Sequence, residues 1–133
     1  MLHCPVCRAP MAVLDFKGVE VDYCLACGGS WLERGEMGLL LEGKLDVDYQ
    51  RYLAGAASPT NRPCPVCGIR LRESAFRGTD IIVDACNLGH GLWLDSGELR
   101  RIIRTGAHRD RVEALSEFYE ALFGKETETR RSP

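Results

Sequence analysis

Two segments of this chain share one order of apolar and polar positions. In the first, the runs Ala12 to Phe16 and Val19 to Tyr23 flank Gly18, and the second run alternates apolar with acidic side chains. Period-two alternation around a glycine turn predicts a β-hairpin with one buried face. Leu71 to Phe76 and Ile81 to Ala85 repeat the pattern in the second half of the chain. The sequence therefore predicts two hairpins of similar design.

A short helix is predicted after each hairpin. Asp95 and Glu98 have the spacing of a capping box, and apolar residues at helical spacing follow them. Glu33 and Glu36 have the same spacing in the first segment, although glutamate is the poorer cap. Gly43 then predicts the end of the first helix.

The remaining segments are predicted to be a connector and a tail. Residues 44–60 read as a connector with a short helix around Asp48 to Ala54. Residues 107–133 predict an amphipathic helix followed by a polar end. That helix either packs back on the rest of the chain or mediates self-association, so a monomer and a dimer both stay open. Its apolar positions are Val112, Leu115, Phe118, Tyr119 and Leu122.

All seven cysteines and one histidine flank the two hairpins. Cys-x-x-Cys pairs separated by sixteen to eighteen residues have the spacing of a zinc ribbon, in which two knuckles share one tetrahedral ion. A hairpin brings the second knuckle back beside the first. The spacing predicts two Zn²⁺ ions per chain, one held by Cys4, Cys7, Cys24 and Cys27, and one held by Cys64, Cys67, Cys86 and His90.

The fourth ligand of the second site departs from the pattern. Aligning Trp31 with Trp93 places Gly89 where Cys27 stands, and His90 follows one position later. A histidine reaches farther than a cysteine, so it can close the tetrahedron. The alternative is a three-ligand site, metal-free or open to water as in catalytic zinc sites.

The motif Cys-Pro-x-Cys, a hairpin, and Cys-x-x-Cys-Gly-Gly-x-Trp-Leu-acid-x-Gly-Glu closely resembles the zinc-ribbon family named for transcription factor IIB, found in short bacterial proteins. The resemblance covers residues 2–42 and 62–104. It implies that the seven cysteines bind zinc and that His90 belongs to a His-Gly-x-Trp variant of the family. It implies no activity, because fold does not determine function. Trp31 and Trp93 are expected in the core, since large rings in small domains are usually buried.

The predicted fold class is a small metal-stapled α+β protein of two tandem zinc ribbons, each a knuckle, hairpin, knuckle and short helix. The domains are ribbon 1 (1–43), the connector (44–60), ribbon 2 (61–106) and the C-terminal helix and tail (107–133). Each ribbon is too small to fold readily without a staple. Zinc binding contributes about 10–16 kcal/mol in such peptides. Metal binding and folding should therefore be one event.

Charge and cysteine use narrow the function. Cys4 leaves little room for a signal peptide after Met1, and no apolar run approaches the roughly 18 residues that span a membrane, so a cytoplasmic protein that does not enter membranes is expected. In a reducing cytosol, cysteines at this spacing favour metal over disulfides. Residues 1–58 hold five basic and eight acidic side chains, and residues 59–133 hold twelve and eleven. A stripe of Arg100, Arg104 and Arg111 could bind phosphates, or it could be a solvated helix face.

We expect a non-enzymatic binding module with structural zinc, whose partner is an unknown macromolecule, nucleic acid or protein. The family resemblance and the arginine stripe favour nucleic acid or the transcription machinery. One alternative is a protein–protein adaptor or oligomerisation module that uses the C-terminal helix. A thiol or zinc redox sensor is a third hypothesis, weakened because zinc-bound thiolates are less available to oxidants.

Overall fold

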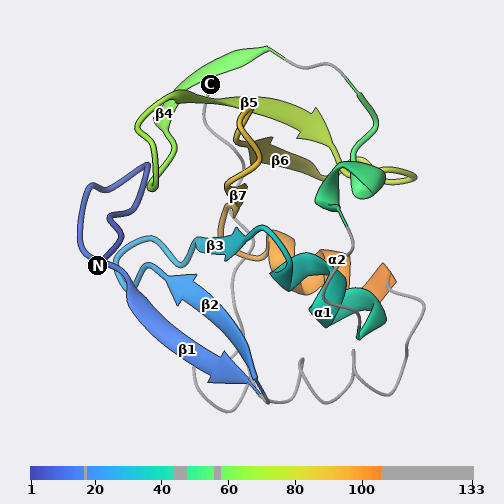
Figure 1. The fold of residues 1–133 in the computed structure, drawn as a ribbon, viewed down its shortest axis with the longest axis horizontal. Helices are drawn as coiled ribbons and strands as arrows, with labels where there is room; N and C mark the ends of the chain where they lie inside the picture. Colours follow the sequence, from blue (N-terminus) through green and yellow to red (C-terminus); the bar gives the residue numbers. More distant parts are fainter. Residues whose placement is uncertain (17, 44–47, 56–57, 106–133) are drawn as a thin grey trace.

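The computed structural model describes residues 1–16, 18–43, 48–55 and 58–105. Within these residues both ribbons contribute to one seven-stranded sheet, whose strand order is β1-β2-β3-β7-β6-β5-β4 (Figure 1). The strands are β1 (Ala12–Phe16), β2 (Val19–Tyr23), β3 (Ser30–Glu33), β4 (Pro59–Pro63), β5 (Arg70–Ala75), β6 (Ile82–Ala85) and β7 (Gly91–Leu94).

Both predicted hairpins are present. β1 pairs antiparallel with β2 from Ala12 opposite Tyr23 to Phe16 opposite Val19. β5 pairs in the same way with β6, where Ala75 lies opposite Ile82. Each hairpin is followed by a third antiparallel strand that carries the tryptophan of its ribbon, β3 in the first and β7 in the second.

The two ribbons join through these third strands. β3 and β7 pair antiparallel, with Trp31 opposite Trp93 and Leu32 opposite Leu92. Because the tryptophans are equivalent residues of the two copies, the junction has an approximate internal twofold relation. Each ribbon alone would expose an unpaired strand edge here, which invites pairing with another chain. In the tandem protein the other ribbon covers that edge. The spacing of the motifs did not predict this pairing of β3 with β7.

Equivalent glycines in the two ribbons make room for the tryptophans across the junction. A Cβ atom placed on Gly29 would overlap the ring of Trp93, and one placed on Gly91 would lie 2.7 Å from the ring of Trp31. Both tryptophans have 0% of their surface exposed, as predicted for core residues. The Gly-x-Trp part of the motif therefore serves contact between ribbons as well as the knuckle.

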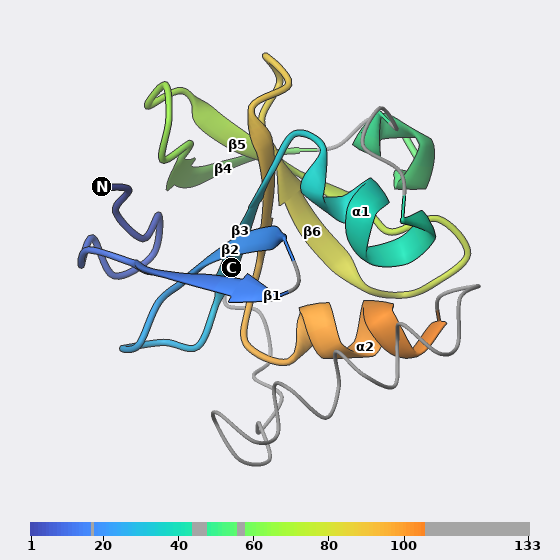
Figure 2. The same cartoon turned by 60° about the horizontal axis from the view of Figure 1, so that its bottom comes forward.

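The helices α1 (Glu36–Glu42) and α2 (Glu98–Thr105) lie near one another beside the sheet (Figure 2). Each begins with the predicted reach-back contact: Glu36 Oε1 accepts the Glu33 N–H at 2.6 Å, and Glu98 Oε1 accepts the Asp95 N–H at 2.7 Å. The prediction of Glu33 as a cap was wrong, because the N-cap of α1 is Gly35 and no side chain caps it. Gly43 ends α1 in the left-handed region with φ 68°, as predicted.

The connector contains a short 3₁₀ helix, η1 (Tyr49–Tyr52). Asp48 caps it by accepting the Gln50 N–H at 2.9 Å, within the segment predicted to be helical. The last residues assigned to the connector belong to β4 instead, since Pro59 lies opposite Arg72 of β5. The predicted helix of residues 107–133 lies outside the described residues.

One apolar cluster draws on both ribbons and on the connector. Its members include Leu32 and Met37 of the first ribbon, Leu92 and Ile102 of the second, and Tyr49 of the connector. A second cluster joins the two tryptophans to Met11, Leu71 and knuckle cysteines of both ribbons. The division into separate ribbon domains stays a prediction, although sheet and core run across its boundary.

Candidate metal centres

The first candidate metal centre is formed by Cys4, Cys7, Cys24 and Cys27. Their sulfur atoms lie within 4.8 Å of one another, and the Sγ atoms of Cys4 and Cys27 are 3.7 Å apart. A zinc–sulfur bond of about 2.3 Å places the sulfurs of a tetrahedral site about 3.8 Å apart. The four thiols are therefore grouped closely enough to bind one zinc ion. None of the seven cysteines of the chain is in a disulfide.

Hydrogen bonds prepare a thiolate in this centre. The backbone N–H groups of Val6 and Cys7 donate to Cys4 Sγ at 3.3 and 3.2 Å. A side-chain hydrogen bond from Cys27, helped by these N–H groups and opposed by burial, lowers the pKa of the Cys4 thiol to about 5. Cys4 therefore offers a thiolate at neutral pH, the form that binds metal.

The second candidate centre is formed by Cys64, Cys67, Cys86 and His90, again within 4.8 Å of one another. The Sγ atoms of Cys67 and Cys86 are 3.8 Å apart, and His90 Nδ1 lies 3.4 Å from Cys86 Sγ. A tetrahedral site with one zinc–nitrogen bond calls for a sulfur–nitrogen distance of about 3.6 Å. His90 thus lies where a fourth ligand belongs, and the two clusters fit two zinc ions.

A one-residue shift of a glycine explains the different fourth ligands. In the first ribbon Gly28 follows Cys27, has φ 79° and donates to the Cys24 carbonyl at 2.8 Å. In the second, Gly89 precedes His90, has φ 83° and donates to the Cys86 carbonyl at 3.1 Å. Each turn needs a left-handed residue, which favours glycine. The shift leaves the longer histidine side chain to approach the metal from one position later.

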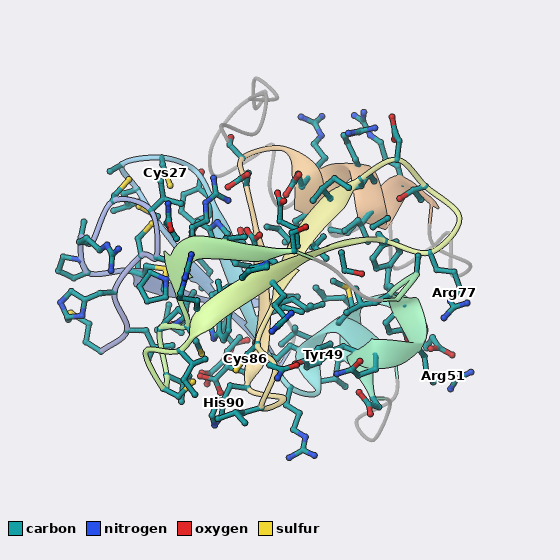
Figure 3. The ribbon with its side chains drawn as sticks, turned by 90° about the horizontal axis from the view of Figure 1, so that it is seen from above. Cys27, Tyr49, Arg51, Arg77, Cys86 and His90 are labelled. Carbon is teal, nitrogen blue, oxygen red and sulfur yellow. The ribbon has the colours of Figure 1, made fainter. Side chains whose placement is uncertain are left out.

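The connector supports the second centre through Tyr49, which sequence reasoning did not single out for this role. Its hydroxyl donates to the carbonyl of Cys86 at 3.0 Å, and its side chain is buried (Figure 3). Burial is the main reason that the pKa of Tyr49 rises to about 12. Burial also raises the pKa of the Cys86 thiol, but N–H donors from His90 and Leu88 outweigh it and bring that pKa to about 7.

A family model described as transcription factor zinc-finger, the transcription factor IIB-type zinc ribbon, matches residues 3–43 and again residues 63–105. The chain belongs to this family. The two matches cover both knuckle pairs, both tryptophans and both short helices, so the ribbons are tandem copies of one unit. No curated protein and no solved structure matches the chain. Within the described residues, no helix is both long and apolar enough to cross a membrane.

The predicted phosphate-binding stripe is only partly visible. Arg100 is 9% exposed, so its guanidinium is not on the surface where the stripe required it. Arg104 is exposed, and Arg111 lies outside the described residues. The stripe therefore stays a prediction, now carried by Arg104 and Arg111 alone.

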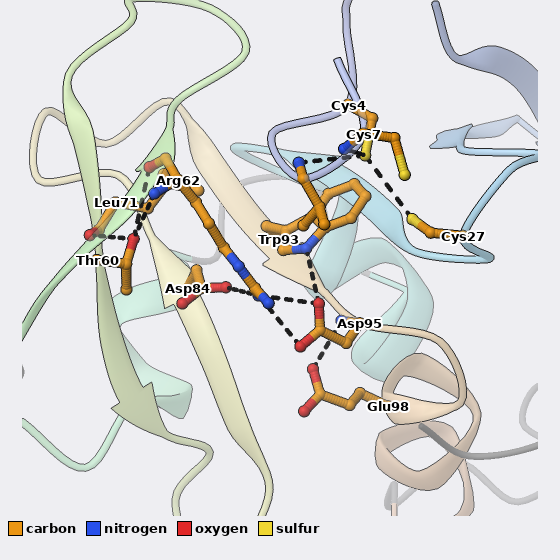
Figure 4. Close-up of polar contacts among 11 residues, drawn as sticks. Cys4, Cys7, Cys27, Thr60, Arg62, Leu71, Asp84, Trp93, Asp95 and Glu98 are labelled. Carbon is orange, nitrogen blue, oxygen red and sulfur yellow. Dashed lines mark hydrogen bonds and ion pairs between the residues drawn. The ribbon is translucent and has the colours of Figure 1, made fainter. Parts of the chain in front are cut away.

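A charged network lies beside the second ribbon's tryptophan (Figure 4). Arg62 Nη1 of β4 contacts Asp84 and Asp95, each at 2.9 Å. Asp95 also accepts the Trp93 indole N–H at 3.1 Å, and its own N–H donates to Glu98. The sequence predicted Asp84 only as part of a hairpin strand and Asp95 only as a helix cap. Arg62 lies between two prolines just before the knuckle, and only the pairing of β4 brings it here.

Proposed function

We propose that this protein is a non-catalytic binding module that contacts the phosphate backbone of nucleic acid through its second ribbon and connector. Supporting the non-catalytic part, both centres offer four protein ligands, whereas catalytic zinc keeps a position for water or substrate. Bound zinc here would supply a cross-link between two knuckles rather than a reactive group.

One observation carries the nucleic-acid part of the proposal. A cavity of about 350 Å³ opens between the connector and β5. Its lining includes Arg72 and Arg77, and among the described residues no acidic residue lines it. Polar Gln50, Ser74 and Asn87 also line it. Phosphate is bound well by guanidinium and neutral polar donors, because each guanidinium offers a planar fork of N–H groups.

Arg77 is held in position at this cavity. Its Nε donates to the Arg51 carbonyl at 3.1 Å, and its Nη2 donates to the Leu53 carbonyl at 2.8 Å. Figure 3 shows Arg51 and Arg77 at the same end of the molecule. Arg70, also on β5, is exposed and donates to Thr60 and Asn61. Exposed arginines thus gather along one edge of the second ribbon.

The test is binding of the zinc-loaded protein to fluorescent single- and double-stranded DNA and RNA at several salt concentrations. Each phosphate contact contributes about −0.7 to −0.9 to the slope of log binding constant against log salt. Replacing Arg72 and Arg77 together with Gln should therefore reduce the slope by about 1.4 to 1.8. Zinc content should not change, because neither residue lies in a knuckle.

Two further variants sharpen this test. Arg34→Gln removes an exposed arginine from the first ribbon and should leave binding and slope unchanged. Arg104→Gln with Arg111→Gln removes the predicted helix stripe; a larger loss there than in the Arg72 and Arg77 variant would transfer the phosphate site to that stripe. No binding by the wild type at low salt would refute the nucleic-acid proposal.

A protein–protein adaptor is the second candidate function, because apolar side chains are exposed at the tips of the knuckles. Val6 and Leu25 are 44% and 74% exposed on the first ribbon, and Val66 and Leu88 are 47% and 59% exposed on the second. Exposed apolar side chains that gather in a patch mark interaction sites. Val66 and Leu88 also line a cavity of about 280 Å³ together with Glu33 and Arg34 of the first ribbon.

The adaptor function predicts a partner whose binding depends on these tips. Leu25→Ser and Leu88→Ser should weaken capture of that partner without changing zinc content, and the capture should resist nuclease and moderate salt. Unchanged capture by both variants would remove the knuckle tips from the interface.

A further inference from the structure

The two ribbons differ at one position beside equivalent acidic residues. Aligning the knuckles places Leu2 at the position of Arg62, and aligning the tryptophans places Asp22 and Glu33 at the positions of Asp84 and Asp95. The backbone supports the match, because the bridge between His3 and Pro10 in the first ribbon corresponds to the pairing of Pro63 with Arg70 in the second. The first ribbon therefore keeps the acidic residues of the network but has no arginine at this position.

A cavity of about 450 Å³ lies at this place in the first ribbon. Among the described residues, none of its lining side chains is basic. Met1 borders it and is 92% exposed, and its N-terminal ammonium favours the charged form of Asp22. The lining joins an apolar wall to four carboxylates; it consists of Met1, Leu2, Met11, Ala12, Val13, Glu20, Asp22, Glu33 and Glu36.

Two side chains near this cavity differ from their counterparts in the second ribbon. Asp22 is only 9% exposed, lines the cavity, and its carboxylate makes no hydrogen bond or ion pair among the described residues. Trp31, which lies opposite Asp22 in the β2–β3 pairing, is fully buried, and its indole N–H is unsatisfied. In the second ribbon the corresponding Asp84 pairs with Arg62, and Trp93 donates to Asp95. A buried group left without its partner costs about 1–3 kcal/mol.

We propose that the cavity of the first ribbon is a binding site for the guanidinium group of an arginine from a protein partner. The second ribbon shows the fit within the same chain: there an arginine side chain reaches the acidic pair that the first ribbon leaves exposed to its cavity (Figure 4). The apolar wall of Leu2 and Met11 suits the aliphatic stem of such a side chain.

A guanidinium group fits this cavity better than a metal ion does. Among the described residues, the groups of three or more ligand atoms within 4.8 Å of one another are the two zinc centres, and the carboxylates of the cavity form no such group. A planar guanidinium bridges separated carboxylates, as Arg62 does between Asp84 and Asp95. Burial raises the pKa of Glu36 to about 8, and the nearby charges of Glu33 and Asp22 add to this. Burial also raises the pKa of Asp22 to about 6, although the N-terminal ammonium opposes that rise.

The experiment titrates the zinc-loaded chain with N-acetyl-arginine amide and follows the two indole N–H signals by nuclear magnetic resonance. We expect a saturable shift of the Trp31 signal and no shift of the Trp93 signal, whose network already holds Arg62. The citrulline analogue has nearly the same shape without the charge and should have no effect.

Two variants distinguish binding in this cavity from nonspecific attraction of a cation to an acidic surface. Leu2→Arg places the chain's own guanidinium at the position of Arg62 and should abolish the response to added arginine amide. Asp22→Asn should weaken that response at least tenfold, with the zinc content and the Trp93 signal unchanged as evidence of correct folding.

Several results would overturn the proposal. Equal shifts of both indole signals, or an equal effect of the lysine analogue, would mean attraction to an acidic surface only. The same Trp31 shift with Mg²⁺ or Ca²⁺ at millimolar concentration would indicate a metal site. No response in the wild type would mean that the cavity does not accept guanidinium. The outcome is independent of the nucleic-acid proposal, whose arginines lie on the second ribbon and the connector.

Discussion

The two ribbons carry the same strands, knuckles and helices but differ in how buried charge is neutralised. In the second ribbon, Arg62 lies between Asp84 and Asp95, and the tryptophan donates to the same network. In the first, a cavity faces the equivalent carboxylates, and the Trp31 indole N–H has no partner among the described residues. One copy thus has an arginine between its acidic residues, and the other has a cavity in that place.

The difference shows how a duplicated unit can divide its roles. Each ribbon supplies two knuckles and one half of the β3–β7 junction, so both are needed for the fold. Residues away from the knuckles and the junction are free to diverge, and the acidic network is such a place. The largest differences in behaviour between the ribbons should therefore come from the network and from the fourth ligand.

Metal removal should have the largest effect and should reveal whether the ribbons are separable. Zinc binding contributes about 10–16 kcal/mol in comparable peptides, so complete chelation should unfold the chain. Protons compete with metal for an imidazole at mildly acidic pH, so the centre with His90 should lose zinc first. A zinc-sensitive dye, read during stepwise acidification of the wild type and His90→Ala, checks the order. Simultaneous release would mean that the two ribbons unfold as one unit.

Arg62→Leu should have the next largest effect, since it gives the second ribbon the residue of the first. Removing one partner of a buried ion pair costs about 3–5 kcal/mol. Denaturant unfolding with excess zinc measures the loss. Leu2→Arg is the matched change in the first ribbon and should not destabilise it, because the acidic cavity accepts the charge. A loss from Leu2→Arg as large as that from Arg62→Leu would contradict the equivalence of the two networks.

Gly29→Ala should weaken the junction between the ribbons. The added methyl overlaps the ring of Trp93, and overpacking of this kind typically costs about 1–3 kcal/mol. Gly29 is not in the left-handed region, so the effect measures the overlap with Trp93 rather than backbone strain. Gly29→Ala should reduce the stability of both ribbons, as measured by hydrogen exchange in β3 and β7. An effect confined to the first ribbon would argue against the junction as the shared element.

Glu36→Gln should change how stability depends on pH. The folded-state pKa of Glu36 is raised to about 8, above the ordinary value of 4.5. Its favourable contribution is therefore complete below pH 4.5 and is lost as pH rises toward 8. Between pH 5 and pH 8 the wild type should therefore lose stability relative to Glu36→Gln, and above pH 8 the difference should level off. The charged neighbours of Glu36 are Glu20, Asp22 and Glu33. The difference between their denaturant midpoints, with zinc in excess, isolates Glu36. A constant difference would disprove the assignment.

Arg8→Gly should have the smallest effect and should be stabilising. Arg8 has φ 65°, and its equivalent in the second ribbon is Gly68 with φ 78°. A non-glycine residue in the left-handed region costs about 1–2 kcal/mol, which the substitution removes. Part of this gain is offset, because glycine makes the unfolded chain more flexible. A rise of about 1 kcal/mol in the unfolding free energy is expected. Gly68→Arg should lose a similar amount, and a gain there would reverse the argument.

Local spacing determined the metal centres. Ligand number, knuckle geometry and the hairpin between knuckles depend on residues close in sequence, so the eight ligands, both hairpins and both reach-back contacts of Glu36 and Glu98 could be predicted. The burial of Trp31 and Trp93 followed from size and apolarity alone. The sequence predicted His90 as the fourth ligand because a histidine side chain is longer than that of cysteine. The structure adds the backbone reason, because the left-handed glycine of the knuckle is Gly28 in the first ribbon and Gly89, one position earlier in the alignment, in the second.

Only the tertiary structure decided how the copies meet and what each buries. The register that places Trp31 opposite Trp93 depends on pairing between strands sixty residues apart, which leaves no periodic signal in either copy. Arg62 also depends on distant pairing, because its charge reaches Asp84 and Asp95 only when β4 joins the sheet. The helical pattern predicted Arg100 on the surface, but packing against the rest of the molecule buries it. Sequence spacing reports local geometry, whereas the partners of a charge depend on which distant strands lie beside it.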